Sequence, residues 1–375
     1  MREVSLRPEL PSHCRRVVVK IGSAALANPT KGVDQSKIEQ IVTDCQALRA
    51  SGIELVLVSS GAIQIGRLAL PKPVDETMDY LQACSALGQP ALMACYSQAF
   101  GAHGLTCAQV LLTHEDIRSR RRSLNLQNMM QRLLEAGVVP ILNENDSVSF
   151  AEITVGDNDQ LAAMVAEMIA ADCLIILSTP DGLYQQDPGA GPGQAIPLVR
   201  YNDSFDGLNL VGKTAAGRGG MRTKLEAVRK LTPLGIPVII GSFKHATPVR
   251  TALAGGGTFF EGSPSPERSA RDRWLVSSAR LGAIIKIDKG ASQALLHKGS
   301  LLPSGIVAVE GNFGRGDCVK VVCGRQTIGS GRVEYSAAEL RRIQGHQSNE
   351  ILGILGYCSA KVAIHRDNLV LREQL

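Results

Sequence analysis

The sequence predicts an α/β protein in which a parallel sheet, covered by helices on both faces, is followed by a small, mainly β domain. Short apolar runs alternate with segments of helical period, and this pattern changes near the glycine stretch at 255–257, which a polar, proline-bearing segment follows from residue 262. The 375 residues, 44% of them hydrophobic, exceed the length of about 250 to 300 residues at which single cores stop growing. We therefore expect a first domain at 1–262, a linker at 263–280, a second domain at 281–365 and a tail at 366–375.

The first strand is predicted at Arg16–Lys20, a β-branched run that ends before the turn residue Gly22. A helix should follow, with Asp34 as its N-terminal cap and Gly52 as its stop. Its apolar residues recur at i, i+3 and i+4: Ile38, Ile41, Val42, Cys45 and Leu48.

Further buried strands are predicted from apolar runs at 55–58, 138–142, 174–177 and 238–240. These runs are continuous rather than alternating, and helical segments separate them. Such strands are typical of a parallel sheet that is buried on both faces, in the three-layer arrangement.

The second domain begins with a predicted strand at Ala283–Ile287 and continues with turn signals at Gly311–Asn312 and 314–317. We expect one helix, because Ser336 and Glu339 form a capping box in front of an apolar pattern. Short strands, frequent turns and a single helix predict a small barrel-like module.

One segment matches the P-loop pattern G-x-x-x-x-G-K-[ST] letter for letter, at Gly207–Thr214. A P-loop must follow a buried strand and open a helix, whereas this segment follows the polar residues Tyr201–Asp206. It also carries bulky residues where a phosphate-binding loop needs permissive ones. We reject the P-loop interpretation.

Other phosphate-binding elements are dispersed along the chain. Lys20 ends the first strand, Ser59–Ala62 follows the second strand, and a glycine-rich loop at 217–224 brings Lys224 to the start of a helix. The carboxyl ends of parallel strands form the usual ligand side of such a sheet, and backbone N–H groups near glycine can approach an anion closely. We expect these elements to meet at one edge.

Two acidic segments strengthen this prediction. Asn143–Asp146 follows a buried strand directly, and Gly156–Asp159 precedes a helix. A helix needs only one cap, so capping accounts for one of Asp157, Asn158 and Asp159 and leaves the others for a function. The apolar residues of this helix that should face inward are Leu161, Met164, Val165 and Met168.

The remaining composition excludes several classes of protein. The nine cysteines form no C-x-x-C pair, so neither a disulfide framework nor a protein-bound metal site is indicated. No segment reaches the roughly 20 apolar residues of a membrane span, and the first 16 residues lack the apolar run of a signal peptide. We expect a cytoplasmic protein without membrane contact. The basic run Arg118–Arg122 is interpreted as a solvated helix face or a subunit contact, with an anion site as the alternative.

Taken together, the polar segments resemble the glutamate 5-kinase family of the amino acid kinase superfamily, over nearly the whole chain. The matching segments are Val18–Ser23, Ser59–Ile63, Asn143–Asp146, Val155–Asp159 and Gly219–Lys224. A region similar to a PUA domain follows, with Gly311–Phe313, Leu340–Ile343 and Ile364–Asp367.

The resemblance implies ATP-dependent phosphorylation of the γ-carboxylate of L-glutamate to L-glutamyl 5-phosphate, the first step of proline biosynthesis from glutamate. It implies Mg²⁺ bound to ATP and a homo-oligomer, either a dimer or a tetramer. It leaves open direct transfer of the product to glutamate-5-semialdehyde dehydrogenase. It also implies feedback inhibition by proline, with Asp116 and Glu152 as candidate residues.

The resemblance also assigns roles to single residues. Lys20 and Lys224 would contact the transferring phosphoryl group, and Asp159 would hold both lysines. The glutamate-binding residues would be Ser60, Gly61, Asp146 and Asn158. The ATP site would be lined by Lys20, Ser178, Thr179, Arg218, Gly219, Gly220, Met221, Arg222, Thr223 and Lys224. The sequence departs from the family pattern at Ser178–Thr179, where a threonine-aspartate pair is usual, and at Arg218 and Arg222, where threonine and serine are usual.

Two alternative functions were weighed. PUA-like domains occur in RNA-modifying proteins, but residues 281–375 carry 12 basic and 8 acidic side chains, a mild excess that does not favour RNA as the main partner. Another amino acid kinase, such as aspartokinase, is disfavoured because the second domain lacks the βαββαβ pattern of two regulatory repeats.

Overall fold

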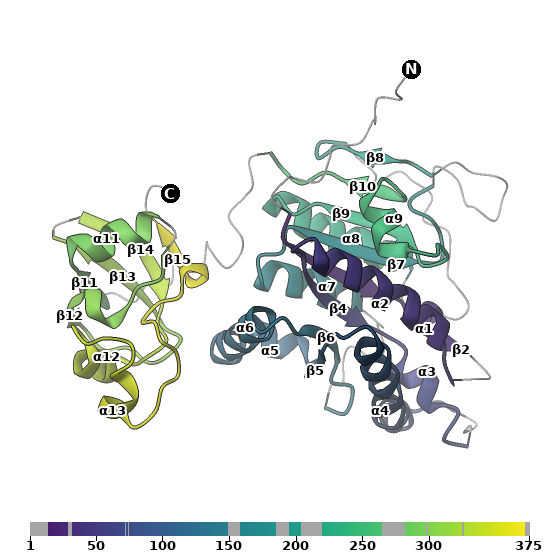
Figure 1. Cartoon of the computed structure of the whole chain (residues 1–375), viewed down its shortest axis with the longest axis horizontal. Helices are drawn as coiled ribbons and strands as arrows, with labels where there is room; N and C mark the ends of the chain where they lie inside the picture. Colours follow the sequence, from purple (N-terminus) through teal and green to yellow (C-terminus); the bar gives the residue numbers. More distant parts are fainter. Residues whose placement is uncertain are drawn as a thin grey trace. The chain divides into compact units, whose positions relative to one another are not determined.

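The computed structural model of the chain is shown in Figure 1. It describes residues 14–28, 32–71, 73, 75–148, 158–184, 195–203, 220–264, 282–297, 299–324 and 326–371, with the backbone alone at 120 and 121. The chain divides into two compact units. The first comprises Met1–Ser119 and Asn125–Glu267, and the second comprises Arg120–Leu124 and Arg268–Leu375.

The first unit is built on an eight-stranded sheet. In spatial order its strands are β5 (Cys107–Leu112), β6 (Val139–Glu144), β4 (Glu54–Ser59), β1 (Arg16–Ile21), β7 (Cys173–Ser178), β9 (Val238–Ser242), β10 (Thr258–Phe260) and β8 (Leu198–Val199). All neighbours pair in parallel except β9 and β10. The predicted parallel sheet is therefore confirmed for its central strands.

The antiparallel pair at the far edge was not predicted. Gly255 and Gly257 have φ angles of 117° and 77° just before β10, a backbone conformation that favours glycine. A Cβ atom at Gly257 would lie 2.2 Å from the carbonyl oxygen of Ile240 in β9, so glycine also permits the close approach of the two strands.

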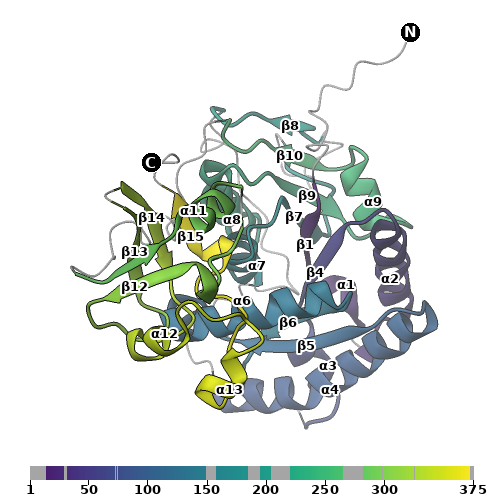
Figure 2. The same cartoon turned by 60° about the vertical axis from the view of Figure 1, so that its left-hand side comes forward.

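Helices cover both faces of this sheet, which confirms the three-layer arrangement. On one face lie α6 (Arg120–Glu135), α7 (Asn158–Met168) and α8 (Met221–Leu231); on the other lie α1 (Ser23–Leu26), α2 (Gln35–Ala50), α4 (Met78–Ala102) and α9 (Pro248–Leu253). Alternate residues of β1 point to opposite faces, so Val18 packs with the first group and Val17 and Val19 with the second. Helices α2 and α9 lie next to each other (Figure 2).

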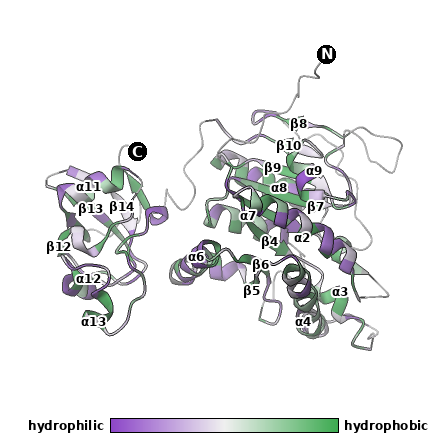
Figure 3. Cartoon of the chain, viewed as in Figure 1, coloured by the Kyte–Doolittle hydropathy of each residue, from purple (hydrophilic) through white to green (hydrophobic). Residues whose placement is uncertain are grey.

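Four further short elements are described in the first unit: α3 (Ala62–Gly66), α5 (His114–Arg118) and the paired strands β2 (Ala27–Asn28) and β3 (Gly32–Val33). The helices carry hydrophobic and hydrophilic residues side by side, as expected for helices with one buried face (Figure 3). No helix in the described part of the chain is both long and apolar enough to cross a membrane.

The predicted helix boundaries are confirmed at α2. Asp34 caps this helix, since its Oδ1 accepts a hydrogen bond from the backbone N–H of Lys37 at 3.2 Å. Gly52 has a φ angle of 81° just past the end of the helix. The inward face predicted for α7 is confirmed as well, because all four of its apolar residues named above are buried.

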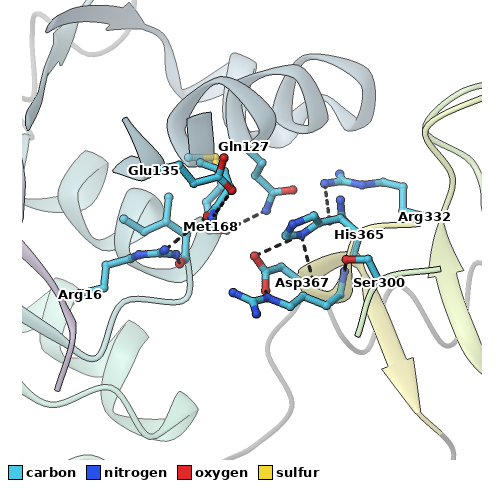
Figure 4. A network of polar contacts seen from close by, with 12 residues as sticks. Arg16, Gln127, Glu135, Met168, Ser300, Arg332, His365 and Asp367 are labelled. Carbon is cyan, nitrogen blue, oxygen red and sulfur yellow. Dashed lines mark hydrogen bonds and ion pairs between the residues drawn. The ribbon is translucent and has the colours of Figure 1, made fainter. Parts of the chain in front are cut away.

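The amino-terminal end of β1 is held by polar contacts at the edge of the sheet away from Lys20 (Figure 4). The guanidinium group of Arg16 donates to the carbonyl oxygen of Ile169 at 2.7 Å and to the carboxylate of Glu54 at 2.7 Å. Close by, Gln127 donates to the carbonyl oxygen of Met168 at 2.7 Å. These bonds hold the start of β1 against the carboxyl end of α7.

The second unit contains a five-stranded sheet, which confirms a separate strand-rich domain. Its strands, in spatial order, are β12 (Ile306–Glu310), β11 (Ile284–Ile287), β13 (Cys318–Cys323), β14 (Gln326–Arg332) and β15 (Leu369–Leu371). Strand β15 lies in the segment for which a tail was predicted, and it pairs with β14. We therefore propose that the second domain extends to Leu371.

The helical content of the second unit was underestimated. The capping box at Ser336 and Glu339 is present and opens α12 (Ala337–Ile343), as predicted. The described residues of this unit form two further α-helices, α11 (Lys289–Leu296) and the short α13 (Ile351–Leu355). Helix α11 is capped by Asp288 and buries only Leu295. A helix with a single buried residue needs no repeated apolar positions, so the pattern that predicts a helix is weak here.

Candidate active site

Four neighbouring parallel strands, β6, β4, β1 and β7, end at one edge of the first sheet. Lys20 is the penultimate residue of β1, Asn143 the penultimate residue of β6 and Ser178 the last residue of β7, and Ser60 directly follows β4. Because the strands are parallel, their carboxyl ends bring these polar residues to the same edge. The structure thus places the dispersed elements predicted from the sequence at the same edge of the sheet.

The centre of this edge is a buried cluster of one carboxylate and two ammonium groups. The Nζ of Lys20 lies 2.6 Å from Oδ1 of Asp159, and the Nζ of Lys224 lies 3.0 Å from Oδ2. Thr223 donates a hydrogen bond from its hydroxyl to Oδ2 at 2.7 Å. The side chains of the two lysines are 8% and 7% exposed, and that of Asp159 is fully buried. The cluster carries a net charge of one positive unit.

Asp159 remains ionised despite its burial. Burial alone would raise the pKa of this carboxyl group, because it disfavours the charged form. The ammonium groups of Lys20 and Lys224, together with hydrogen bonds from Lys20 and Thr223, outweigh burial and hold the pKa well below its ordinary value of 3.8. At neutral pH, Asp159 is an anion that holds both lysines.

Two helix starts bring the cluster together. Asp159 is the second residue of α7, and Thr223 and Lys224 lie in the first turn of α8. Helices α7 and α8 pack against each other on the same face of the sheet. The hydroxyl of Thr223 also donates to the carbonyl oxygen of Gly220 at 3.0 Å, which closes the first turn of α8.

A network of neutral polar groups adjoins the cluster at Asn158. The Nδ2 of Asn158 donates to the hydroxyl oxygen of Ser60 at 2.7 Å, to Oδ1 of Asn143 at 3.0 Å and to the carbonyl oxygen of Ser59 at 3.1 Å. Asn158 directly precedes Asp159 in the chain. The ends of β4 and β6 are therefore tied to the residue next to the charged cluster.

Helix α4 supplies two residues to this network that the sequence analysis did not identify. The Nδ2 of Asn143 donates to Oε1 of Gln89 at 2.9 Å, and the hydroxyl of Ser85 donates to Oδ2 of Asp146 at 2.5 Å. Ser85 and Gln89 stand four residues apart on the buried face of α4. Two polar residues at helical spacing within an apolar face are the signal that could have identified them.

Glycines determine how α3 and α4 approach the site. Gly61 has a φ angle of 111° at the start of α3, in the left-handed region that favours glycine. A Cβ atom at Gly88 of α4 would lie 1.9 Å from the carbonyl oxygen of Ala62, and one at Gly66 would lie 1.8 Å from that of Cys84. The two helix backbones are therefore in direct contact beside Ser60 and Gly61.

The residues expected to line the ATP site are only partly grouped. Ser178 and Thr179 lie at the end of β7, where their carbonyl oxygens accept hydrogen bonds from the backbone N–H of Phe243 at 3.1 Å and the hydroxyl of Ser242 at 3.3 Å. Arg222 is directed away from the cluster. Its side chain is 82% exposed, and its Nε lies 3.0 Å from Oε1 of Glu226.

The remaining predicted residues are distributed as follows. Gly220 precedes α8 and Met221 begins it. The other predicted residues, Arg218, Gly219 and Glu152, lie outside the described residues, as does the rejected P-loop segment Gly207–Thr214.

Asp116, a candidate for proline feedback, has a clear structural role. Its carboxylate accepts hydrogen bonds from the backbone N–H and the hydroxyl of Thr113, at 2.7 and 2.8 Å, and forms the capping box of α5. The structure thus explains this residue as a helix cap.

Comparisons with known proteins agree with this arrangement. Residues 15–242 match the model of the amino acid kinase family, and residues 283–355 match that of the PUA domain. A relative from Trichlorobacter lovleyi named glutamate 5-kinase is 42% identical over 376 residues, which cover 98% of this chain and 99% of the relative. Relatives of the same name from Myxococcus xanthus and Carboxydothermus hydrogenoformans are 44% and 42% identical, over 95% and 97% of this chain and 96% and 99% of the relatives.

Proposed function

Since the chain belongs to the amino acid kinase family, and within it to the glutamate 5-kinases, we propose that its buried Lys20–Asp159–Lys224 cluster transfers the γ-phosphoryl group of ATP to L-glutamate. The acceptor is the γ-carboxylate, and the product is L-glutamyl 5-phosphate. This reaction is the first step of proline biosynthesis. The observation that carries the assignment is the ionised carboxylate that holds two lysines at the ligand edge of the sheet.

The nucleophile needs no activation by the protein. A glutamate γ-carboxyl group has an ordinary pKa of about 4.3, so it is ionised at neutral pH and no general base is required. The difficulty is electrostatic, because one anion must attack another. The protein must therefore supply positive charge around the γ-phosphoryl oxygens.

Lys20 and Lys224 supply this charge. An ammonium group has three N–H donors, so a lysine that pairs with one carboxylate oxygen can still donate to a phosphoryl oxygen. Asp159 orients both ammonium groups and offsets part of their mutual repulsion, so they remain charged in a buried position. Mg²⁺ enters with ATP as part of the substrate and neutralises charge on the β- and γ-phosphates.

The neutral network and Asp146 form the glutamate subsite. A carboxylate such as Asp146 recognises the α-ammonium group of glutamate and disfavours an N-acylated amino acid. Asn158, the hydroxyl of Ser60 and the backbone of Gly61 bind the carboxylate end of the substrate. In this proposal the γ-carboxylate lies beside the lysine cluster, and the consecutive positions of Asn158 and Asp159 support it.

ATP lies between the end of β7 and the start of α8. Ser178 and Thr179 line one side, and Gly220–Lys224, preceded by Arg218 and Gly219, line the other. No side chain of the described residues caps the start of α8 at Met221, and backbone N–H groups at a helix start favour phosphate. Arg222 contributes little to this site, because its side chain is exposed and pairs with Glu226.

Family membership supports four further proposals. The enzyme acts in the cytoplasm as a homodimer or homotetramer, and it transfers its unstable acyl phosphate to glutamate-5-semialdehyde dehydrogenase. Proline inhibits it, with Asp116 and Glu152 as candidate residues. Because Asp116 caps α5, a substitution there tests feedback only if the melting temperature is unchanged.

Trapping of the acyl phosphate with hydroxylamine tests the proposed function. The protein is incubated with ATP, Mg²⁺ and hydroxylamine together with glutamate, aspartate or N-acetylglutamate, and the hydroxamate is measured. UMP, tested in parallel, is scored by formation of ADP. Glutamate alone should support turnover. Preferred turnover of any other acceptor would overturn the assignment.

A further inference from the structure

Helix α4 carries three buried polar side chains on one face, Ser85, Gln89 and Tyr96, and each contacts a different part of the active-site edge. Positions 85, 89 and 96 are separated by four and seven residues, so they share one side of the helix. Ser85 contacts Asp146, Gln89 contacts Asn143, and the hydroxyl of Tyr96 lies 3.1 Å from that of Ser59. Through these side chains, α4 contacts residues at and just after the ends of β4 and β6.

Gln89 contacts Asn143, whose amide orientation determines that of Asn158. The amide of Asn143 has a donor end and an acceptor end. Its Oδ1 accepts from the backbone N–H of Glu144 at 2.9 Å, and a backbone N–H group can only donate. The Nδ2 of Asn143 therefore faces the opposite way, where Oε1 of Gln89 accepts its hydrogen bond at 2.9 Å.

The orientation of Asn143 sets that of Asn158. Oδ1 of Asn143 also accepts from Nδ2 of Asn158, so Asn158 must present its NH₂ group on this side. The same NH₂ group donates to the hydroxyl oxygen of Ser60 at 2.7 Å. Because this oxygen accepts there, the hydroxyl hydrogen of Ser60 points elsewhere and is available to an anionic ligand.

We propose that Gln89 is a positioning residue for L-glutamate: by accepting the hydrogen bond of Asn143, it holds Asn158 and directs the hydroxyl of Ser60 as a donor to the substrate carboxylate. This inference rests on the proposed function. Gln89 does not touch the substrate; it acts through Asn143 and Asn158. Its loss would leave the Nδ2 of Asn143 without this acceptor, so that only the contacts of Oδ1 with Glu144 and Asn158 would hold the amide.

The backbone around Gln89 is suited to this role. The adjacent Gly88 packs against the carbonyl oxygen of Ala62 in α3, where a Cβ atom would lie only 1.9 Å away. Helix α4 therefore lies directly against α3, the helix that follows Ser60 and Gly61. Gln89 is 7% exposed, so water does not readily replace its acceptor.

The variant Gln89→Met tests the inference, because methionine has a similar length and no acceptor of comparable strength. We expect the KM for glutamate to rise about tenfold, the effect of losing one buried hydrogen bond, with the KM for ATP changed less than twofold. Gln98→Met is the matched control: Gln98 lies on the same helix but is exposed, and both KM values should be unchanged. If Gln89→Met does not fold, Gln89→Leu is measured in the same way.

A double-mutant cycle with Ser60→Ala separates positioning from a structural effect. If Gln89 acts through Ser60, then Gln89→Met should raise the KM for glutamate less than threefold when Ser60 is already alanine. A tenfold rise in both backgrounds, or equal rises in the KM for glutamate and for ATP, would refute the role of Gln89. The wild-type protein is the reference for the function itself. If it forms no hydroxamate from glutamate, the proposed function fails, whereas an active wild type with an unaffected Gln89→Met variant refutes only this inference.

Discussion

The substitution Asp159→Asn removes the charge that holds Lys20 and Lys224 while keeping the size of the side chain. The three groups are at least nine-tenths buried, and the two contact distances are 2.6 and 3.0 Å. Removing one partner of a buried ion pair typically costs about 3 to 5 kcal/mol, because the remaining charge stays unpaired. We therefore expect the free energy of unfolding to fall by about that amount at pH 7.

The loss of stability should depend on pH with a definite sign. The pKa of Asp159 in the folded protein lies below its ordinary value of 3.8, so the unfolded state takes up the proton first as the pH falls. The stability contributed by the charged carboxylate is thus complete above about pH 4 to 5 and is lost as the pH falls towards the lower folded value. The difference in unfolding free energy between wild type and Asp159→Asn should shrink below pH 4.

Catalysis should suffer by an amount comparable to the loss of folding stability. Without Asp159, the lysine charges that should stabilise the transition state are misplaced. Such a loss costs about 3 kcal/mol, or at least about a hundredfold in kcat. Urea denaturation between pH 3 and pH 7 and hydroxamate formation at pH 7 measure the two effects. Asp75→Asn is the matched control, because Asp75 is exposed, and it should leave both unchanged. A kcat within threefold of wild type, or a stability difference that is the same at pH 3 and pH 7, would refute the reasoning.

Three further predictions follow from the site. Lys20→Ala and Lys224→Ala should each lower kcat at least about a hundredfold in the hydroxamate assay without unfolding the protein, whereas the control Lys289→Ala, at an exposed position, should not lower it. Near-normal turnover of Lys20→Ala or Lys224→Ala would remove the substituted lysine from the mechanism. Asp146→Asn should raise the KM for glutamate at least about tenfold more than that for ATP, since a charged contact to the ammonium group is lost; equal rises would contradict the assignment. Gly88→Ala should lower the unfolding free energy by about 1 to 3 kcal/mol in urea titrations, because the new methyl group would lie 1.9 Å from a carbonyl oxygen of α3. Unchanged stability would contradict the close packing of the two helices.

The central strands and the charged cluster could be predicted from the sequence because their signals are local. The continuous apolar run that ends at Lys20 and the run at 174–177 correspond to β1 and β7. The polar residues after them could be placed at one edge because parallel strands share their carboxyl ends. Asp159 lies more than 60 positions from Lys20 and from Lys224 in the chain, and only the family pattern indicated that its carboxylate holds both lysines.

Other features depend on tertiary packing that leaves little trace in the sequence. Strand β5 carries Ala108 and Gln109 in place of a continuous apolar run, and it was not predicted. The roles of Ser85 and Gln89 depend on how close α4 comes to β6, which small residues such as Gly88 permit. Asp116 shows the opposite case, since a local capping box, readable as Thr113 followed by an acid three residues later, gives it a structural role.

The most direct test of the central claim is the fate of an oxygen atom. Glutamate labelled with ¹⁸O in its γ-carboxylate is incubated with the protein, Mg-ATP and hydroxylamine, and the released phosphate is analysed by mass spectrometry. If the γ-carboxylate attacks the γ-phosphorus, its oxygen becomes the bridge of the acyl phosphate. Hydroxylamine then attacks the carbonyl carbon, and the phosphate leaves with one ¹⁸O atom. Phosphate that carries no label would show hydrolysis of ATP by water and would contradict the account.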